Sequence, residues 1–295
     1  MGIGKLFRRL GVLSLGCFLY GVFIEPYQYR VRRFRVPILP AGAAPIRVLH
    51  ISDAHLLARN HSRLNFLRAL AGLEPDLVVC TGDMISEPEA VDALDVALER
   101  LRQFPGVFVF GSSDYVKPKP INPLKYLFSP SARRKFEPDL PYEQLAQTLA
   151  PWHNLNNRQV ELELRGTKLE LRGTNDAHVD LDDYASLAGP PAAGATLIGV
   201  THAPYQRVLD ELTSDGARLI LTGHTHGGQV CVPIYGALVT NCDLPSEQAK
   251  GLSRWETGEH TAYLHVSAGV GQSPAAPFRF SCPPEVTLLT LTPRR

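Results

Sequence analysis

Two histidines that stand two residues apart, His224 and His226, lie in a stretch whose residue types suit metal binding. The stretch runs from Arg218 to Val230 and reads Arg-Leu-Ile-Leu-Thr-Gly-His-Thr-His-Gly-Gly-Gln-Val. Its short apolar run, Leu219 to Leu221, is typical of a buried strand. The glycines on both sides let the backbone adopt tight or positive-φ conformations. We expect both imidazoles to project from a strand end into one pocket, although an isolated His-x-His pair would favour a polar turn with solvated histidines.

Four further predicted strands end in side chains of the same kind. These strands and the residues that follow them are Ile46–Ile51 with Asp53 and His55, Asp76–Thr81 with Asp83, Val107–Phe110 with Ser112, Ser113 and Asp114, and Ala195–Val200 with His202. Helical spacing of apolar residues between the first three strands gives a β-α-β-α-β order, which implies parallel strands with their C-terminal ends at one edge. Taken alone, each aspartate could be a helix cap, and each histidine could be a buried residue with satisfied hydrogen bonds. Their joint placement at successive strand ends predicts a common site.

The chemistry of these side chains indicates a pair of metal ions. Carboxylate and imidazole ligands suit manganese, iron or zinc better than calcium. The candidate ligands are Asp53, His55, Asp83, His202, His224 and His226. Six ligands are too many for one tetrahedral catalytic zinc, which takes three protein ligands and keeps a position open. Two divalent ions about 3.5–4 Å apart can activate a water and stabilise the charge that develops in an in-line displacement at phosphorus.

In order and spacing, these motifs resemble those of the calcineurin-like metallophosphoesterases, and most closely the small bacterial members with an N-terminal membrane anchor. The resemblance covers about residues 46 to 293. It implies an α/β fold, a four-layer α/β/β/α sandwich. It also implies hydrolysis of a phosphoester, preferably a phosphodiester, by a metal-activated water at a dinuclear site. By resemblance, Asp53, His55 and His226 would hold one ion, His202 and His224 the other, and Asp83 would bridge them.

The third motif departs from the family pattern. The family usually has Gly-Asn-His-Asp or Gly-Asn-His-Glu, and some anchored relatives have Gly-Ser-Asn-Asp, whereas this chain has Gly111-Ser112-Ser113-Asp114. A serine hydroxyl is a weaker ligand than an amide oxygen and cannot act as a cationic acid near neutral pH. We therefore expect a weakened second metal site and slower hydrolysis, or a preference for leaving groups that need no protonation. Ser112, Ser113 and Asp114 are the catalytic candidates of this degenerate motif.

Three further residues are candidates for substrate contact or for compensation of the missing Asn and His. Asp176 and His178 follow a predicted β-hairpin over 159–172, where a polar turn is an equally good interpretation. Arg254 is a candidate phosphate contact, and a surface Arg-Trp pair is the alternative. At the level of function, the alternative is a metal-binding pseudoenzyme that keeps the fold but has lost turnover through Ser112 and Ser113. A dimetal protein of oxygen chemistry is a third possibility, which the motif order disfavours.

The N-terminal segment differs from the rest of the chain. Lys5, Arg8 and Arg9 precede 15 uncharged, mostly apolar residues, Leu10 to Ile24. This is shorter than the roughly 20 residues of a spanning helix, but no Ala-x-Ala cleavage site follows directly, so we expect a retained signal anchor. The expected organisation is an anchor over residues 1–25, a juxtamembrane basic strand and linker over 26–45, and a metallophosphoesterase domain over 46–295.

The expected location is the cell membrane. Charges before the apolar segment place the N-terminus inside, and the arginines between residues 30 and 35 argue the reverse. On balance we expect the domain on the extracytoplasmic side. A solvated strand face explains these arginines, with contact to anionic lipid as the alternative.

Composition narrows the remaining function classes. The net charge is +1, so there is no basic field to indicate a nucleic-acid partner. The five cysteines are scattered without a Cys-x-x-Cys pair, which argues against a zinc ribbon or a disulfide framework. The expected partners are the membrane and a phosphoester substrate, for which a lipid-linked or envelope phosphoester is the candidate. Residues 115–141 are rich in proline and basic residues and predict a long excursion beside the site.

Overall fold

The computed structural model describes residues 3–118, 136–272, 274 and 276–294. Residues 119–135, most of the excursion expected beside the site, lie outside this part of the chain. The helices are α1 (Ile3–Phe23), α2 (His61–Ala69), α3 (Ala90–Leu98), α4 (Ser112–Tyr115), α6 (Tyr142–Thr148) and α7 (Gln206–Ser214). Short 3-10 turns are η1 (Glu25–Tyr27), η2 (Leu70–Leu73), η3 (Leu101–Gln103), η4 (Ala177–Val179), η5 (His226–Gly228) and η6 (Ser246–Gln248).

The strands form two six-stranded sheets and one small ribbon. The first sheet has the order β1 (Arg30–Leu39), β14 (Glu285–Pro293), β2 (Ile46–Ile51), β3 (Leu77–Cys80), β4 (Gly106–Phe108), β5 (His153–Asn154). The second has the order β12 (Gly251–Thr257), β13 (His260–Val266), β9 (Leu219–Thr222), β8 (Thr196–Val200), β7 (Thr167–Gly173), β6 (Arg158–Leu164). The ribbon pairs β10 (Cys231–Val232) with β11 (Gly236–Ala237).

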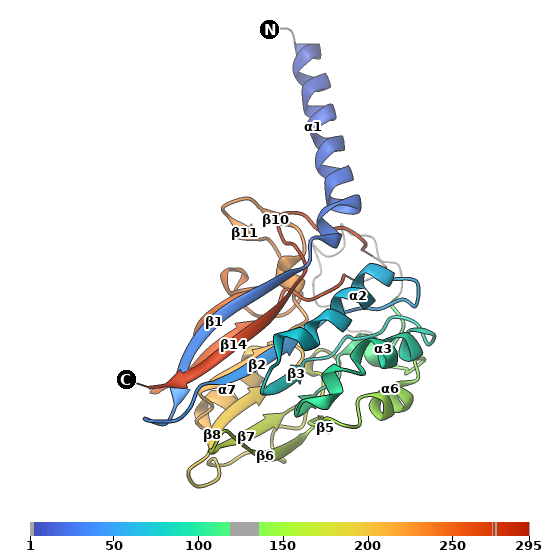
Figure 1. Ribbon diagram of the computed structural model, residues 1–295. Helices are drawn as coiled ribbons and strands as arrows, with labels where there is room; N and C mark the ends of the chain where they lie inside the picture. Colours follow the sequence, from blue (N-terminus) through green and yellow to red (C-terminus); the bar gives the residue numbers. More distant parts are fainter. Residues whose placement is uncertain (1–2, 119–135, 273, 275, 295) are drawn as a thin grey trace.

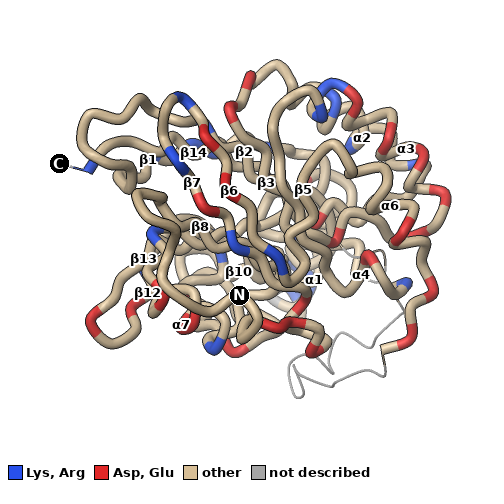
Figure 2. Tube along the Cα trace, turned by 90° about the horizontal axis from the view of Figure 1, so that it is seen from below, with Lys and Arg blue, Asp and Glu red and all other residues tan. Residues whose placement is uncertain are grey.

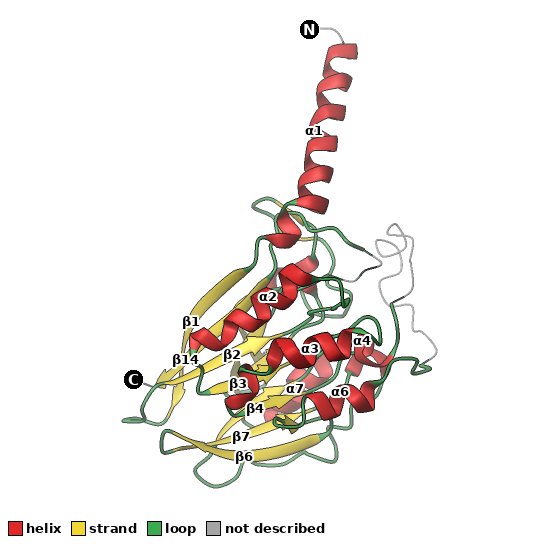
Figure 3. Cartoon of the chain, turned by 45° about the vertical axis from the view of Figure 1, so that its right-hand side comes forward, coloured by secondary structure: helices red, strands yellow, loops and turns green. Residues whose placement is uncertain are grey.

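The two sheets pack face to face and helices cover their outer faces, which confirms the predicted four-layer α/β/β/α sandwich (Figure 3). Strand β2 illustrates the packing. Ile46 and Val48 belong to the core between the sheets, whereas Leu49 and Ile51 belong to the core under α2 and α3. A strand that is buried on both faces has no polar face, which explains its nearly continuous apolar sequence.

Strand direction brings the candidate ligands to one end of the sandwich. In the first sheet β2, β3 and β4 are parallel neighbours, and in the second sheet β8 and β9 are parallel neighbours. The loops that follow these strands carry the expected ligands. The predicted common edge is therefore present in both sheets.

Helix α1 projects from this same end of the molecule (Figure 1). Strand β14 runs parallel to β1 and antiparallel to β2, with Arg30 opposite Glu285 and His50 opposite Thr287. The start of β1, which follows α1, and the end of β2, which precedes Asp53, thus lie at one end of the first sheet. The segment Phe7–Tyr27 is long and apolar enough to cross a membrane, a property that a signal sequence shares.

The place of the basic strand β1 differs from the expected organisation, in which the domain begins at residue 46. It pairs with β14 along Arg30 to Leu39, so the expected basic strand is an edge strand of the first sheet and does not lie outside it. Arg32 contacts Glu285 at 3.1 Å, and Arg33 and Arg35 are exposed. Charged side chains on an edge strand discourage pairing with a second chain. Figure 2 shows basic and acidic residues interspersed over the domain, as the small net charge implies.

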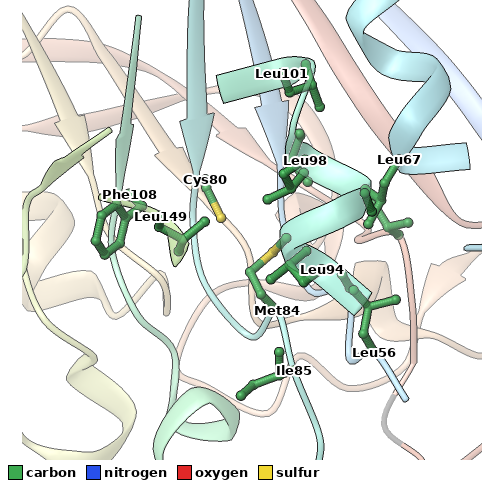
Figure 4. Packing of buried hydrophobic residues seen from close by; sticks show 14 of the residues in the cluster. Leu56, Leu67, Cys80, Met84, Ile85, Leu94, Leu98, Leu101, Phe108 and Leu149 are labelled. Carbon is green, nitrogen blue, oxygen red and sulfur yellow. The ribbon is translucent and has the colours of Figure 1, made fainter. Parts of the chain in front are cut away.

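We expect Leu94→Ala to lower the free energy of unfolding by about 2–5 kcal/mol, because truncation of a buried leucine leaves a cavity. Leu94 lies on α3 among Met84, Leu98 and Leu67 in the core under the helices (Figure 4). Val96→Ala on the same helix is the matched control, because Val96 is 54% exposed and its truncation should change stability by less than about 0.5 kcal/mol. Urea unfolding of the full chain in detergent measures both variants. An equal loss of unfolding free energy in Leu94→Ala and Val96→Ala would show that the Leu94 face of α3 is not packed in the core.

Candidate metal centre

Five of the six predicted ligands have a left-handed backbone. The φ angles are 52° at Asp53, 42° at His55, 55° at Asp83, 69° at His224 and 50° at His226. A non-glycine residue in this region costs on the order of 1–3 kcal/mol and persists only where its surroundings hold it. Such conformations gather at functional sites, and here they turn each side chain from a strand end toward one point.

The first compact group is Asp53, His55 and His226, whose ligand atoms all lie within 4.8 Å of one another. His55 Nε2 lies 3.1 Å from His226 Nε2, and Asp53 Oδ1 lies 3.6 Å from His226 Nε2. Asp53 and His55 follow β2 of the first sheet, whereas His226 follows β9 of the second. The group therefore spans both sheets.

The second compact group is Asp53, Asp83 and His202. Asp83 Oδ2 lies 3.3 Å from His55 Nε2 and 3.5 Å from His202 Nε2, so one carboxylate oxygen stands between the two groups. His202 Nε2 is buried and has no hydrogen-bond partner among the described residues. Asp53 belongs to both groups and Asp83 contacts a histidine of each, so the bridging role of Asp83 stays a prediction.

His224 lies beside the second group, with its ring centroid 5.3 Å from that of His202. Its Nε2 lies 3.2 Å from the backbone oxygen of Asn241, which can only accept a hydrogen bond. Nε2 therefore carries the proton, and Nδ1 is the nitrogen that His224 can offer to an ion.

Backbone carbonyls also set the tautomers of two other histidines. His202 Nδ1 donates to the Thr81 oxygen at 2.6 Å, and His226 Nδ1 donates to the Gly271 oxygen at 3.0 Å. In the neutral form of each ring the lone pair is therefore on Nε2, which faces the cluster. Partners of this kind orient metal-binding histidines in proteins.

Burial and charge oppose each other at His202 and Asp83. Burial disfavours the charged imidazole, but the carboxylates of Asp83, Asp176 and Asp53 outweigh it and raise the pKa of His202 well above its usual value. Burial also disfavours the ionised carboxyl of Asp83, but the neighbouring histidines, His202 foremost, lower its pKa well below the usual value. Burial raises the pKa of Asp53 to about 7. The cluster thus concentrates buried carboxylates that a cation would stabilise.

At the other three histidines burial is not outweighed by the neighbouring carboxylates. It lowers the pKa of His55 to about 4, and it lowers the pKa values of His224 and His226 well below the usual value of imidazole. These rings are neutral near pH 7. Neutral imidazole is the form of histidine that binds metal.

Asp114 holds two loops together and does not face the cluster. Its carboxylate accepts four backbone hydrogen bonds of 2.7–3.3 Å, from the N–H groups of Asp83, Met84, Ile85 and Gly111. Four donors occupy the acceptor capacity of its two oxygens. The expectation that Asp114 takes part in catalysis is therefore corrected to a positioning role.

Ser112 and Ser113 begin α4 at the edge of the cluster and are half-buried. The backbone N–H of Ser113 donates to Asp83 Oδ1 at 2.8 Å, so the third loop contacts the central carboxylate through its main chain. The two side chains supply hydroxyl groups at the positions where the family pattern has an amide and an imidazole.

Asp176 and His178 lie on the His202 and His224 side of the cluster. Asp176 is fully buried, and its Oδ2 has no hydrogen-bond partner among the residues that the structure describes. The centroids of the His178 and His224 rings are 4.5 Å apart, and His178 Nδ1 is 3.0 Å from the Tyr205 hydroxyl. His178 and Tyr205 also line a cavity of about 330 Å³ together with Ala177, Asp180, Arg207, Cys242 and Asp243.

Arg254 is not part of the site. It is exposed on β12, with its guanidinium 5.3 Å from the centre of the Tyr263 ring. Tyr263 pairs in register with Leu219 at the start of β9, at the opposite end of that strand from His224. This position favours the alternative of a surface residue over a phosphate contact.

Two buried arginines near the cluster escaped the sequence analysis. Arg63 Nη1 donates to the backbone oxygens of Ala54 and His55, at 2.6 and 3.0 Å. Arg279 is fully buried, donates to the oxygens of Ala268 and Gly271, and approaches His226 Nδ1 at 3.5 Å. Both clamp the loops that carry ligands. No local pattern marks an arginine for such a role, because the carbonyls that it binds come from distant segments.

The donor set fits two divalent ions. Carboxylates and neutral imidazoles converge, a buried His202 nitrogen lacks a partner, and glycines leave room for the cluster. A Cβ atom on Gly223 would overlap Ser52 and Asp53, and one on Gly269 would lie 2.7 Å from Asp53 Cβ. These residues can therefore hold cations.

Comparison with known proteins agrees with this chemistry. The model of the calcineurin-like phosphoesterase family matches residues 46–228. Three similar bacterial proteins cover nearly the whole chain. The uncharacterized metallophosphoesterase YkuE of Bacillus subtilis is 24% identical over 94% of this chain and 90% of its own length. Phosphodiesterase YaeI of Escherichia coli is 26% identical (93% and 92%), and UDP-2,3-diacylglucosamine pyrophosphatase LpxG of Chlamydia trachomatis is 26% identical (90% and 90%).

We expect Gly111→Ala to weaken manganese binding by about 10–100-fold, the range seen when the support of metal ligands is lost. An added Cβ would overlap Asp83 Oδ1 and lie 2.6 Å from His202 Nε2, so the central carboxylate would have to move. Gly72→Ala is the matched control, because a Cβ there meets no atom within 4 Å. Titration calorimetry of the full chain with Mn²⁺ measures both. Unchanged affinity in Gly111→Ala would contradict the assigned position of Asp83.

Proposed function

The chain belongs to the calcineurin-like phosphoesterase family and is a hydrolase of phosphoesters, and from this premise we propose that it cleaves a phosphodiester or pyrophosphate bond in a substrate held at the surface of a lipid bilayer. The observation that carries the proposal is the common end of the molecule at which α1 leaves and the candidate ligands gather. If α1 anchors the protein, the metal centre faces the membrane rather than the bulk solution.

The names of the relatives support the class of substrate. One acts as a phosphodiesterase and another as a pyrophosphatase on a diacylated sugar nucleotide, as their names state. Both kinds of bond have an anionic phosphoryl group between two substituents. A lipid-linked or envelope molecule with such a bond suits a site beside a membrane helix.

Each residue of the cluster has a proposed role. Asp53, His55 and His226 hold one ion, His202 and His224 hold the other, and Asp83 lies between them. Two divalent ions, when bound, supply an activated water and stabilise the phosphoryl charge. The buried carboxylates and the carbonyl-fixed histidines keep the ligand atoms in place, so that little reorganisation is needed during the reaction.

His178 is the proposed partner of the leaving group. The third loop has no imidazole, whereas the His178 ring lies beside His224 and lines the 330 Å³ cavity. From there it can donate a proton to a leaving oxygen, and the cavity can accept the rest of the substrate. Arg207, whose guanidinium is paired with Asp182, and Tyr205 lie at the same cavity.

We expect the full chain in detergent to hydrolyse bis-p-nitrophenyl phosphate only with added manganese, and Asp83→Asn to lower kcat by roughly 10²–10³-fold or more, as expected when a central electrostatic group is lost. Asp92→Asn, an exposed carboxylate on α3, is the matched control and should leave turnover unchanged. Absence of turnover in a folded protein that binds manganese would favour the alternative, a metal-binding pseudoenzyme.

Ser112→Asn combined with Ser113→His distinguishes a decayed site from a working variant. If the serines reflect lost chemistry, the double variant should hydrolyse phenyl phosphodiesters, whose leaving group needs a proton, about 10²-fold faster or more. If His178 supplies the proton, the double variant gains little, and His178→Gln slows phenyl substrates far more than p-nitrophenyl substrates. Turnover of both substrates by the wild type, the double variant and His178→Gln measures this. Equal slowing of both substrates by His178→Gln would argue against the role of His178.

A further inference from the structure

The exposed apolar residues of the described chain are concentrated in two places. Apart from Val96, the large exposed ones lie on α1 and the turn after it, or in the segment of residues 230–239 that contains β10 and β11. We call residues 230–239 the hairpin segment. Its exposed residues are Val230, Val232, Ile234, Tyr235 and Leu238. It reads Val-Cys-Val-Pro-Ile-Tyr-Gly-Ala-Leu-Val and has no charged residue.

Ile234 and Tyr235 form the tip of the hairpin segment. Ile234 is fully exposed and Tyr235 is 74% exposed. Contiguous exposed apolar residues of this kind mark a binding surface, for protein or for membrane. The position of the segment decides between these partners.

The hairpin segment is joined to α1 through residues 278–280. Val230 forms a β-bridge with Phe280, and the Cys231 N–H donates to the Phe280 oxygen at 2.8 Å. The Phe280 ring packs edge-on against Tyr20 of α1, with 6.3 Å between centroids. Phe278 stacks on Phe18 at 5.9 Å. Aromatic side chains thus form a continuous layer from the lower part of α1 to the hairpin segment.

Hydrogen bonds fix the same arrangement. The Arg279 N–H donates to the Gly21 oxygen at 2.9 Å. The buried carboxylate of Glu25 accepts from the backbone N–H groups of Ser281 and Cys282. The end of α1 and the loop beside the hairpin segment are therefore bonded to each other, and Figure 1 shows β10 and β11 next to the base of α1.

We propose that the hairpin segment is a second membrane contact, which inserts Ile234, Tyr235 and Leu238 into the interfacial layer of the bilayer beside α1. The inference rests on the membrane placement proposed above. Three observations favour a bilayer over a protein partner: continuity with a helix that is exposed and apolar, the absence of charge over ten residues, and a tyrosine at the tip, a residue enriched at membrane interfaces.

This contact bears on the metal centre because the hairpin segment directly follows η5, which contains His226. The Cys231 thiol contacts the Gly227 oxygen at 3.2 Å, so the start of the segment packs under the ligand loop. With α1 on one side and the hairpin segment on the other, the ligand edge is held at a fixed depth over the lipid headgroups. A phosphoester attached to a lipid can then reach the ions while its acyl chains stay in the bilayer.

The test measures the depth of the hairpin tip in the full chain, reconstituted in nanodiscs of phosphatidylethanolamine and phosphatidylglycerol. Tyr235→Trp places a reporter at the tip, and Val96→Trp places one at an exposed site on α3. Subtraction of the wild-type spectrum removes Trp152 and Trp255. Lipids brominated near the top of the acyl chain should quench the reporter of Tyr235→Trp about twofold, as expected for side chains that enter the first 5–10 Å of the bilayer. The reporter of Val96→Trp should not be quenched.

Ile234→Asp in the Tyr235→Trp background should abolish the quenching, because a carboxylate at the tip opposes insertion. An unquenched reporter in Tyr235→Trp itself would overturn the proposal. Emission that shifts to shorter wavelength without quenching, and only when two chains share a nanodisc, would also overturn it in favour of contact between copies. Turnover of bis-p-nitrophenyl phosphate, which needs no bilayer, should be unchanged in Ile234→Asp. Loss of that turnover alone would bear on the proposed function and not on the hairpin segment.

Discussion

The buried carboxylate of Asp83 is the point on which the structure of the site depends. Its Oδ2 lies between a histidine from the first sheet, His55, and one from the second, His202. Its Oδ1 is fixed by the Ser113 N–H, and its own N–H donates to Asp114. Two sheets that meet mainly through apolar packing are thus joined at their edge by charge. A carboxylate with these neighbours is stable in the interior only when positive charge compensates it, from His202 or from metal ions.

Local patterns predicted the parallel strands and the cluster at their ends, whereas the four-layer sandwich was implied by the resemblance to the phosphoesterase family. Apolar runs that end in Asp or His mark strand ends, and parallel strands place such ends together. The same reasoning could not place Arg30 beside Glu285, because a pairing between residues 255 apart leaves no local trace. For this reason the basic strand was expected outside the domain, whereas β1 pairs with β14 as an edge strand of the first sheet.

Buried polar contacts were also not predictable from the sequence. Asp114 followed a catalytic motif and was assigned to it, yet its four backbone donors come from two loops whose approach only the folded chain reveals. Arg63 and Arg279 are ordinary basic residues in the sequence, but each satisfies carbonyls of ligand loops. The hydrogen bonds of such residues hold the ligand loops in the strained, positive-φ conformation. Their loss should act on metal affinity before it acts on the fold.

The bonds of Glu25 to Ser281 and Cys282 have a kinetic consequence. An anchor joined to its domain by a flexible linker would let the active site sample a volume of solution. If α1 anchors this protein, the end of the anchor is instead bonded to a loop of the domain. A membrane-bound substrate would then meet the enzyme by lateral diffusion in two dimensions. The rate would follow the mole fraction of substrate in the lipid, and dilution of the whole suspension with buffer would leave it unchanged.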